Sequence, residues 1–152
     1  AERLAAALER NGALVELILG SNHFGPQGVE WLASCLERNA ALAALNLDSN
    51  NVGDRGAERL AAALERNGTL TGLDLRHAHV GNQGAERIAA ALQHNVTIWA
   101  LNIGGNDVGP EAAERLAAAV ARNRAGVRVL TVRCSPQGSE RCRVACTSMA
   151  GS

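Results

Sequence analysis

The sequence has no lysine and no tyrosine, and its aromatic residues make up only 2% of 152 positions. With so few aromatic rings, the core volume has to come from leucine, isoleucine, valine and alanine, which predicts a thin and closely layered core. Arginine supplies all 15 basic residues, and 15 acidic residues balance them, so the formal net charge is zero. General nucleic-acid binding depends on a basic face, so we expect no nucleic-acid partner.

A long apolar segment is also missing. A helix that spans a bilayer needs roughly 18 or more consecutive apolar residues, and the sequence has no such run. No stretch has the charged, apolar and small-residue order of a secretory signal. We therefore expect a cytoplasmic protein without a membrane span. Because the sequence starts without methionine and in the middle of a repeat pattern, we expect it to be a fragment or a subunit of something larger.

The feature that dominates the sequence is a repeat. Leu14, Leu42, Leu70 and Ile98 follow one another at intervals of 28 residues, and each opens a unit with the same spacing of leucine, asparagine, glycine and alanine. We number these units 1 to 4. The sequence divides into residues 1–11, a partial unit; 12–123, the four units; 124–134, a last strand that opens one residue late; and 135–152, an irregular tail containing Cys and Arg.

Each unit combines two periods. In unit 2, Leu45 and Leu47 alternate with polar or small residues, as in a short strand with one buried face. Ala57, Leu60 and Leu64 then form one apolar stripe of a helix. Proline at equivalent positions of units 1 and 4 marks helix starts at Pro26 and Pro110. Helix ends are expected at Asn39, Asn67, Asn95 and Asn123, because asparagine accepts left-handed backbone geometry.

One strand and one helix per unit predict an α/β solenoid. Successive strands should run parallel about 4.8 Å apart, whereas packed helices need about 8–10 Å. The stack should therefore curve into a horseshoe, with the parallel β-sheet on the concave side and the α-helices on the convex side.

The pattern LxxLxLxxNxxGxxGAxxLAxxLxxN, from Leu42 to Asn67, resembles the ribonuclease-inhibitor-like subclass of leucine-rich repeats, over nearly all of residues 1–132. The resemblance implies protein binding, usually through the concave face or its rims. Members of the subclass include ribonuclease inhibitors, activators of small GTPases and ligand-sensing regions of immune receptors.

Binding information should lie in the variable positions of the strands, since packing dictates the others. On the concave face the candidate partner-binding residues are Glu16, Ile18, Asn46, Asp48, Asp74, Arg76 and Asn102, with Trp99 at the rim. A basic or amide-rich partner segment is expected, with the aspartates as acceptors. The alternative is that these are ordinary solvated strand residues.

Trp31 is a candidate contact on the convex face. Its equivalents in the other units are Arg59, Arg87 and Arg115, on the outward side of the helix. Because tryptophan is enriched at interface hot spots, we expect it to meet a partner or a neighbouring element. The open N-terminal end and the basic C-terminal tail are two further possible contacts.

Histidine and cysteine need separate treatment. His77 and His79 flank Ala78, where other units have asparagine, so unit 3 is expected to differ locally. No suitable third ligand is near in sequence, so a metal site is not expected. Cys35 is expected to pack in a helix. Cys134, Cys142 and Cys146 match no zinc pattern, and their redox state is left open.

No catalytic constellation or phosphate-binding glycine loop is present, so we expect neither an enzyme nor a cofactor. The predicted function is a protein–protein interaction module or scaffold. One alternative is a small-GTPase regulator, acting through Asn46, Asn50, Asp74 and Arg76. Another is the ligand-sensing region of an immune receptor or effector. The sequons at Asn67 and Asn95 are interpreted as by-products of the repeat.

Overall fold

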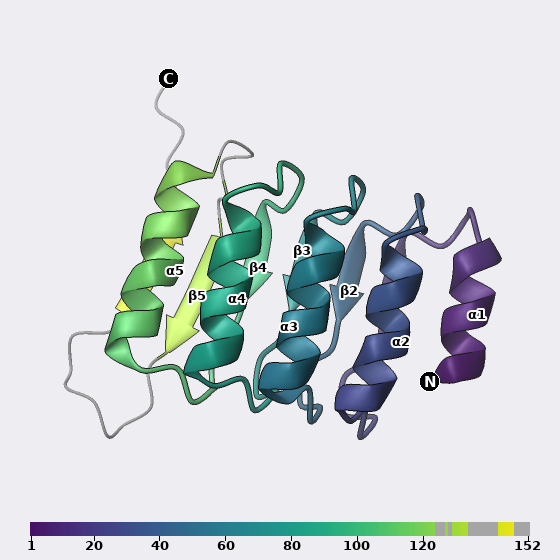
Figure 1. The fold of residues 1–152 in the computed structure, drawn as a ribbon, viewed down its shortest axis with the longest axis horizontal. Coiled ribbons are helices and arrows are strands. Elements are labelled where there is room, and N and C mark those ends of the chain that lie inside the picture. The colour runs from purple at the N-terminus through teal and green to yellow at the C-terminus, as the bar shows by residue number, and fades with distance from the viewer. Residues whose placement is uncertain (124–126, 128, 134–142, 148–152) are drawn as a thin grey trace.

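The computed structural model describes residues 1–123, 127, 129–133 and 143–147. The helices form one layer and the strands a second layer behind it, as Figure 1 shows. The helices are α1 (Glu2–Arg10), α2 (Pro26–Leu36), α3 (Gly53–Leu64), α4 (Asn82–Leu92) and α5 (Pro110–Arg122). The strands are β1 (Glu16–Ile18), β2 (Ala44–Asn46), β3 (Gly72–Asp74), β4 (Ala100–Asn102), β5 (Val129–Arg133) and β6 (Arg143–Thr147). This arrangement confirms the predicted α/β solenoid.

The sheet has the order β1-β2-β3-β4-β5-β6, and its first five strands are parallel. Leu45 pairs with Leu17 of β1 and with Leu73 of β3, so neighbouring strands align at an offset of 28 residues, from 17 to 45 to 73. β5 pairs with β4 at an offset of 29, from Leu101 to Leu130, which confirms the predicted one-residue delay. The strands are parallel because each helix returns the chain to the start of the next strand.

The last strand corrects the sequence prediction. Residues 143–147 form β6, which pairs antiparallel with β5, so the expectation of an irregular tail over 135–152 is wrong there. This segment has no alternating apolar pattern that would reveal a strand; its backbone pairs with an edge of β5 that would otherwise be open. Cys134 and Cys142 lie outside the described residues, as does the side chain of Cys146.

The core is one layer of side chains between the helices and the sheet. Leu45 and Leu47 are only 2% and 0% exposed, and Ala57 and Leu60 are fully buried, which confirms both predicted periods. A single cluster of buried residues runs through the stack from α1 to β5. Because each leucine side chain contributes about 1.5–3 kcal/mol when buried, the stack depends on its leucines rather than on aromatic residues.

The helix starts agree with the sequence prediction, and so does the end of α5, whose C-cap is Asn123, but the ends of α2, α3 and α4 do not. α2 and α5 begin at Pro26 and Pro110. α3 and α4 end at Leu64 and Leu92, three residues before the asparagine of each unit. None of the four asparagines adopts a left-handed backbone, so their recurrence must have another cause. Among the described helices, none has the length and apolar character needed to cross a bilayer.

Candidate protein-binding surface

The outward side chains of β1–β4 form a shallow groove of about 250 Å³ on the concave face. This concave groove is lined by Glu16, Ala44, Leu45, Asn46, Gly72, Leu73, Asp74, Ala100, Leu101 and Asn102. The small residues Ala44, Gly72 and Ala100 align across neighbouring strands, and the polar residues align beside them. The groove therefore has a floor of small side chains and a row of polar ones, and it includes four of the predicted contact residues.

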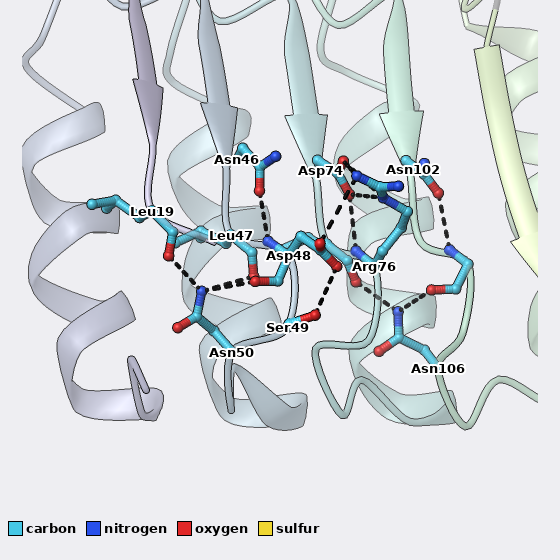
Figure 2. A network of polar contacts seen from close by, with 12 residues as sticks. Leu19, Asn46, Leu47, Asp48, Ser49, Asn50, Asp74, Arg76, Asn102 and Asn106 are labelled. Atoms are coloured by element: carbon cyan, nitrogen blue, oxygen red, sulfur yellow. Dashed lines mark hydrogen bonds and ion pairs between the residues drawn. The ribbon is translucent and has the colours of Figure 1, made fainter. Parts of the chain in front are cut away.

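Asn46 and Asn102 give this row hydrogen-bond donors. The Asn46 Oδ1 accepts the backbone N–H of Asp48 at 2.8 Å, and the Asn102 Oδ1 accepts that of Gly104 at 3.2 Å. Because a backbone N–H needs an oxygen acceptor, these bonds fix which way each amide points. Figure 2 shows both amides with their nitrogens turned away from these bonds. Neither Nδ2 has a hydrogen-bond partner among the residues that the structure describes.

Arg76 and Asp74 form a close ion pair at the end of β3 (Figure 2). The Arg76 Nε lies 3.0 and 2.9 Å from the two Asp74 carboxylate oxygens, and Nη2 lies 2.8 Å from Oδ2. The hydrogen bond to Asp74 raises the pKa of Arg76, and the charges of Asp74 and Asp48 add to the shift. Asp74 thus already has a cationic partner, so the concave groove is less suited to a basic segment than the sequence indicated.

Three predicted contact residues are apolar and exposed. Ile18 on β1 is 66% exposed, Trp99 just before β4 is 48% exposed, and Trp31 on α2 is 37% exposed. Trp31 borders a hollow of about 280 Å³ with Ala1 and Phe24. The structure therefore confirms that both tryptophans reach the surface, on different faces. Their role in binding stays a prediction.

The recurring asparagines that follow the helices link neighbouring units along one edge of the stack, which we call the helix-end edge. The Asn67 Nδ2 donates to the carbonyls of Leu36 (2.7 Å) and Asn39 (3.1 Å) in unit 1. Its Oδ1 accepts the N–H groups of Thr69 (2.9 Å) and Leu70 (2.6 Å) in the next segment of the chain. The same bonding to the preceding unit recurs at Asn39, Asn95 and Asn123. This ladder satisfies helix carbonyls that would otherwise lack partners.

The ladder also bears on whether the two sequons could be glycosylated. Asn67 and Asn95 are only 6% and 4% exposed, and the Nδ2 atom of each donates to backbone carbonyls. An amide nitrogen buried in this way is not available for attachment of a sugar in the folded chain. The ladder therefore gives both asparagines a structural role that does not involve a sugar.

A second ladder lies at the opposite edge, where the strands lead into the helices; we call it the turn edge. The Asn50 Nδ2 donates to the carbonyls of Leu19 (2.9 Å) and Leu47 (3.1 Å), as Figure 2 shows. Its Oδ1 accepts the N–H groups of Asn22 (3.1 Å) and Phe24 (2.8 Å) in the preceding unit. Asn106 repeats this pattern toward unit 3.

Ala78 interrupts the turn-edge ladder. It is fully buried and offers no side-chain acceptor for the N–H groups of Asn50 and Val52, which have no hydrogen-bond partner among the described residues. Instead Gly53 donates its N–H to the Ala78 carbonyl at 3.0 Å and adopts a φ of +63°, which glycine tolerates.

The local difference therefore falls in the turn of unit 2, and the expectation that unit 3 differs is wrong. The Oδ1 of an asparagine at this position accepts N–H groups of the preceding unit only, whereas its Nδ2 donates to carbonyls of both units.

Metal and thiol chemistry are not apparent in the described part of the chain. No group of three histidine, cysteine, aspartate or glutamate side chains is placed to hold a metal ion there. Cys35 is buried in α2 as predicted. Burial raises the pKa of the Cys35 thiol, and the nearby Glu9 carboxylate raises it further. A protonated, buried thiol is a packing group rather than a nucleophile.

Comparisons with known proteins agree with this geometry. A family model described as "Leucine Rich repeat" matches residues 38–61, 66–89 and 94–117. Among curated proteins, none matches this chain. One similar solved structure is leiomodin-1 actin-binding site 2, with 20% identity and a TM-score of 0.77 over 86% of this chain and 78% of that one.

Another is the tropomodulin C-terminal domain of Caenorhabditis elegans, with 14% identity and a TM-score of 0.74 over 88% and 81% of the two chains. At these identities the likeness shows the fold alone.

Proposed function

We propose that this chain, three units of which match a leucine-rich-repeat family model, is a protein-interaction module that binds an extended segment of a partner across its concave groove. The observation that carries the proposal is the donor row: Asn46 and Asn102 present amide N–H groups with no partner in the described residues. A partner backbone offers carbonyl acceptors at regular intervals. Leaving those donors unpaired in an interface would cost about 1–3 kcal/mol each, so a fitting partner has to supply acceptors.

The floor and the ends of the groove favour a narrow partner segment. Ala44, Gly72 and Ala100 leave room for a backbone to approach the sheet closely. Ile18 and Trp99 offer exposed apolar surface beside the groove, and tryptophan is a frequent anchor in interfaces. Trp31 lies on the convex face, so a contact there would belong to a second, separate part of a partner.

Actin is the first named candidate partner. A chain of similar fold, leiomodin-1, is described as an actin-binding site, and the likeness covers 86% of this chain. The small-GTPase alternative is less well supported, because one of its four polar residues, Asn50, is buried at 3% exposure within the turn-edge ladder.

A blocking variant and a matched control test the proposal. Gly72→Arg places a long side chain on the groove floor; the first atom of that side chain would meet only the Ala44 Cβ at 3.9 Å, so the fold should tolerate it. Ala62→Arg adds the same charge at an exposed position of α3. The readouts are co-sedimentation with purified actin filaments and quantitative affinity capture from a cell lysate, with both variants beside the wild type.

We expect Gly72→Arg to lose captured proteins that Ala62→Arg retains. If every captured protein binds Gly72→Arg as well as it binds the wild type, the concave groove is not the binding surface. If the wild-type chain does not co-sediment with actin filaments, actin is not the partner, but the proposal that the concave groove binds a protein still stands.

A further inference from the structure

We infer that a pocket on the turn edge, among units 1 to 3, binds a phosphate group. The pocket has a volume of about 390 Å³. This turn pocket is lined by His23, Gly25, Ser49, Asn50, Asn51, His77 and His79. Three of the four histidines of the chain therefore line one hollow, and none of the described carboxylates lines it. The inference does not depend on the concave groove, which is on another surface.

The backbone around the turn pocket has unused donors. Asn50 lines the pocket, and its N–H is one of the two left without a partner in the described residues by Ala78. Gly25 is the N-cap of α2, which has neither a side-chain cap nor an acidic residue in its first turn. Unpaired N–H groups at a helix start favour an anion.

The corresponding helix starts in later units have acceptors of their own. The Asp54 Oδ1 accepts the N–H groups of Gly81 (2.7 Å) and Gly84 (2.8 Å) at the start of α4. The Asn82 Oδ1 accepts the N–H of Gly109 (2.6 Å) at the start of α5. The equivalent residue of unit 1 is Pro26, which lies beside Gly53 at the start of α3 and has no side-chain acceptor. The starts of α2 and α3 therefore have no side-chain acceptor among the described residues, while those of α4 and α5 have one each.

The histidines are held in place by the turns. His23, His77 and His79 all have left-handed backbones, with φ of 55°, 49° and 57°, which few L-residues adopt. The His77 ring packs against Gly105 so closely that a Cβ there would lie 2.3 Å from its Cε1. A ring held in this way can donate to an oxyanion with little loss of side-chain freedom.

The charged groups around the turn pocket leave room for an anion. Asp48 accepts from Ser49 (3.1 Å) and lies 3.9 Å from Arg76, which directly precedes His77. Asp54 is occupied by the start of α4. Asp107 is exposed in the turn of unit 4, beyond His79. Each imidazole that takes up a proton becomes a double donor with a positive charge, so binding should strengthen as the pH falls.

The test is a titration with inorganic phosphate at about pH 6 and about pH 8, on either side of the ordinary histidine pKa, with sodium chloride at matched ionic strength as the ionic control. Backbone amide chemical shifts in the folded chain give both the affinity and the site. We expect affinity at the lower pH to be about tenfold higher or more, since charge-assisted hydrogen bonds are about twice as strong as neutral ones. The shifts should centre on Ser49, Asn50 and His79.

Two variants separate the pocket from general charge effects. His23→Asn with His79→Asn uses the residue that unit 2 carries at the equivalent position, Asn51, and asparagine accepts a left-handed backbone. We expect this double variant to lose about tenfold in affinity at the lower pH. His94→Asn, at an exposed position outside the turn pocket, is the matched control and should bind phosphate like the wild type.

A third variant keeps the test valid if the double variant unfolds. Ala78→Asn supplies the missing acceptor for the Asn50 N–H and should stabilise the fold while weakening phosphate binding about fivefold, the value of one hydrogen bond. Comparing the affinity for a phosphoserine peptide with that for free phosphate shows whether the pocket prefers a partner's phosphorylated side chain or a free ion. Equal affinity in all variants, or equal loss in His94→Asn, overturns the inference.

Discussion

The two edges of the repeat stack use the same asparagine chemistry with different outcomes. At the helix-end edge the ladder is continuous from Asn39 to Asn123, and every unit is bonded to the one before it. At the turn edge the ladder stops at Ala78, where a turn changes its backbone and the histidine-lined turn pocket lies. The complete ladder only holds the units together, whereas the interrupted ladder leaves backbone N–H groups that a ligand could accept from.

Removing a rung of the continuous ladder should have the largest effect. Asn67→Ala leaves the Leu36 and Asn39 carbonyls and the Thr69 and Leu70 N–H groups without their partner. We expect unfolding free energy to fall by about 3 kcal/mol, because unsatisfied buried groups cost about 1–3 kcal/mol each and some will recruit water. Urea unfolding followed by circular dichroism measures the loss.

The natural gap supplies a check on that prediction. Asn106→Ala copies the situation of Ala78 at the next position of the turn edge and should cost less, about 2 kcal/mol, since turns can rearrange as unit 2 has done. If both variants cost the same, the two edges do not differ in the way the structure indicates.

Gly105→Ala should have the next largest effect. Gly105 has a φ of +71°, and a Cβ there would meet the His77 ring. A left-handed alanine costs roughly 1–2 kcal/mol, and the His77 ring has to move as well. The expected loss is about 1.5 kcal/mol, seen as a lower midpoint of thermal unfolding. Gly68→Ala is the control, because nothing lies within 4 Å of its added Cβ.

Repairing the interrupted ladder should stabilise the chain. Ala78→Asn gives the Asn50 and Val52 N–H groups an acceptor, as Asn106 gives Ala78 and Val80. We expect a gain of about 1 kcal/mol in unfolding free energy. Faster amide exchange at Asn50 and Val52 than at Ala78 and Val80 in the wild type would support the same view. A loss of stability would show that unit 2 has no room for the side chain.

The sequence predicts the parts of this fold that depend on burial. The spacing of Leu45, Leu47 and Leu60 reports which side chains face the core, so the parallel register and the layers follow from it. Hydrogen-bond partners are a different matter, because Asn67 bonds residues 28 and 31 positions away and periodicity does not specify which group accepts. The asparagine recurrence was visible, but only the structure assigns it to the preceding unit.

The candidate sites are predictable to a similar extent. Alternation placed Asn46, Asp74 and Asn102 on one face, yet it could not show that Asp74 is paired with Arg76. The turn pocket combines His23 with His77 and His79, 54 and 56 residues later (77 − 23 and 79 − 23). The signal was the repeat itself, since His23 and His79 occupy equivalent positions two units apart.

The smallest effect should come from Arg66→Ala, next to Asn67 in the chain. Arg66 also bonds to unit 1, through an ion pair with Glu37 at 2.7 Å, but its side chain is 71% exposed. Water and salt replace an exposed pair at little cost, so the expected loss is about 0.5 kcal/mol or less and should vanish in high salt. Arg66 and Asn67 are adjacent and both bond to unit 1, but only Asn67 is buried, so the two variants show how much burial adds to the stability that such a bond provides. If Arg66→Ala lowers the unfolding free energy as much as Asn67→Ala does, burial does not strengthen the ladder.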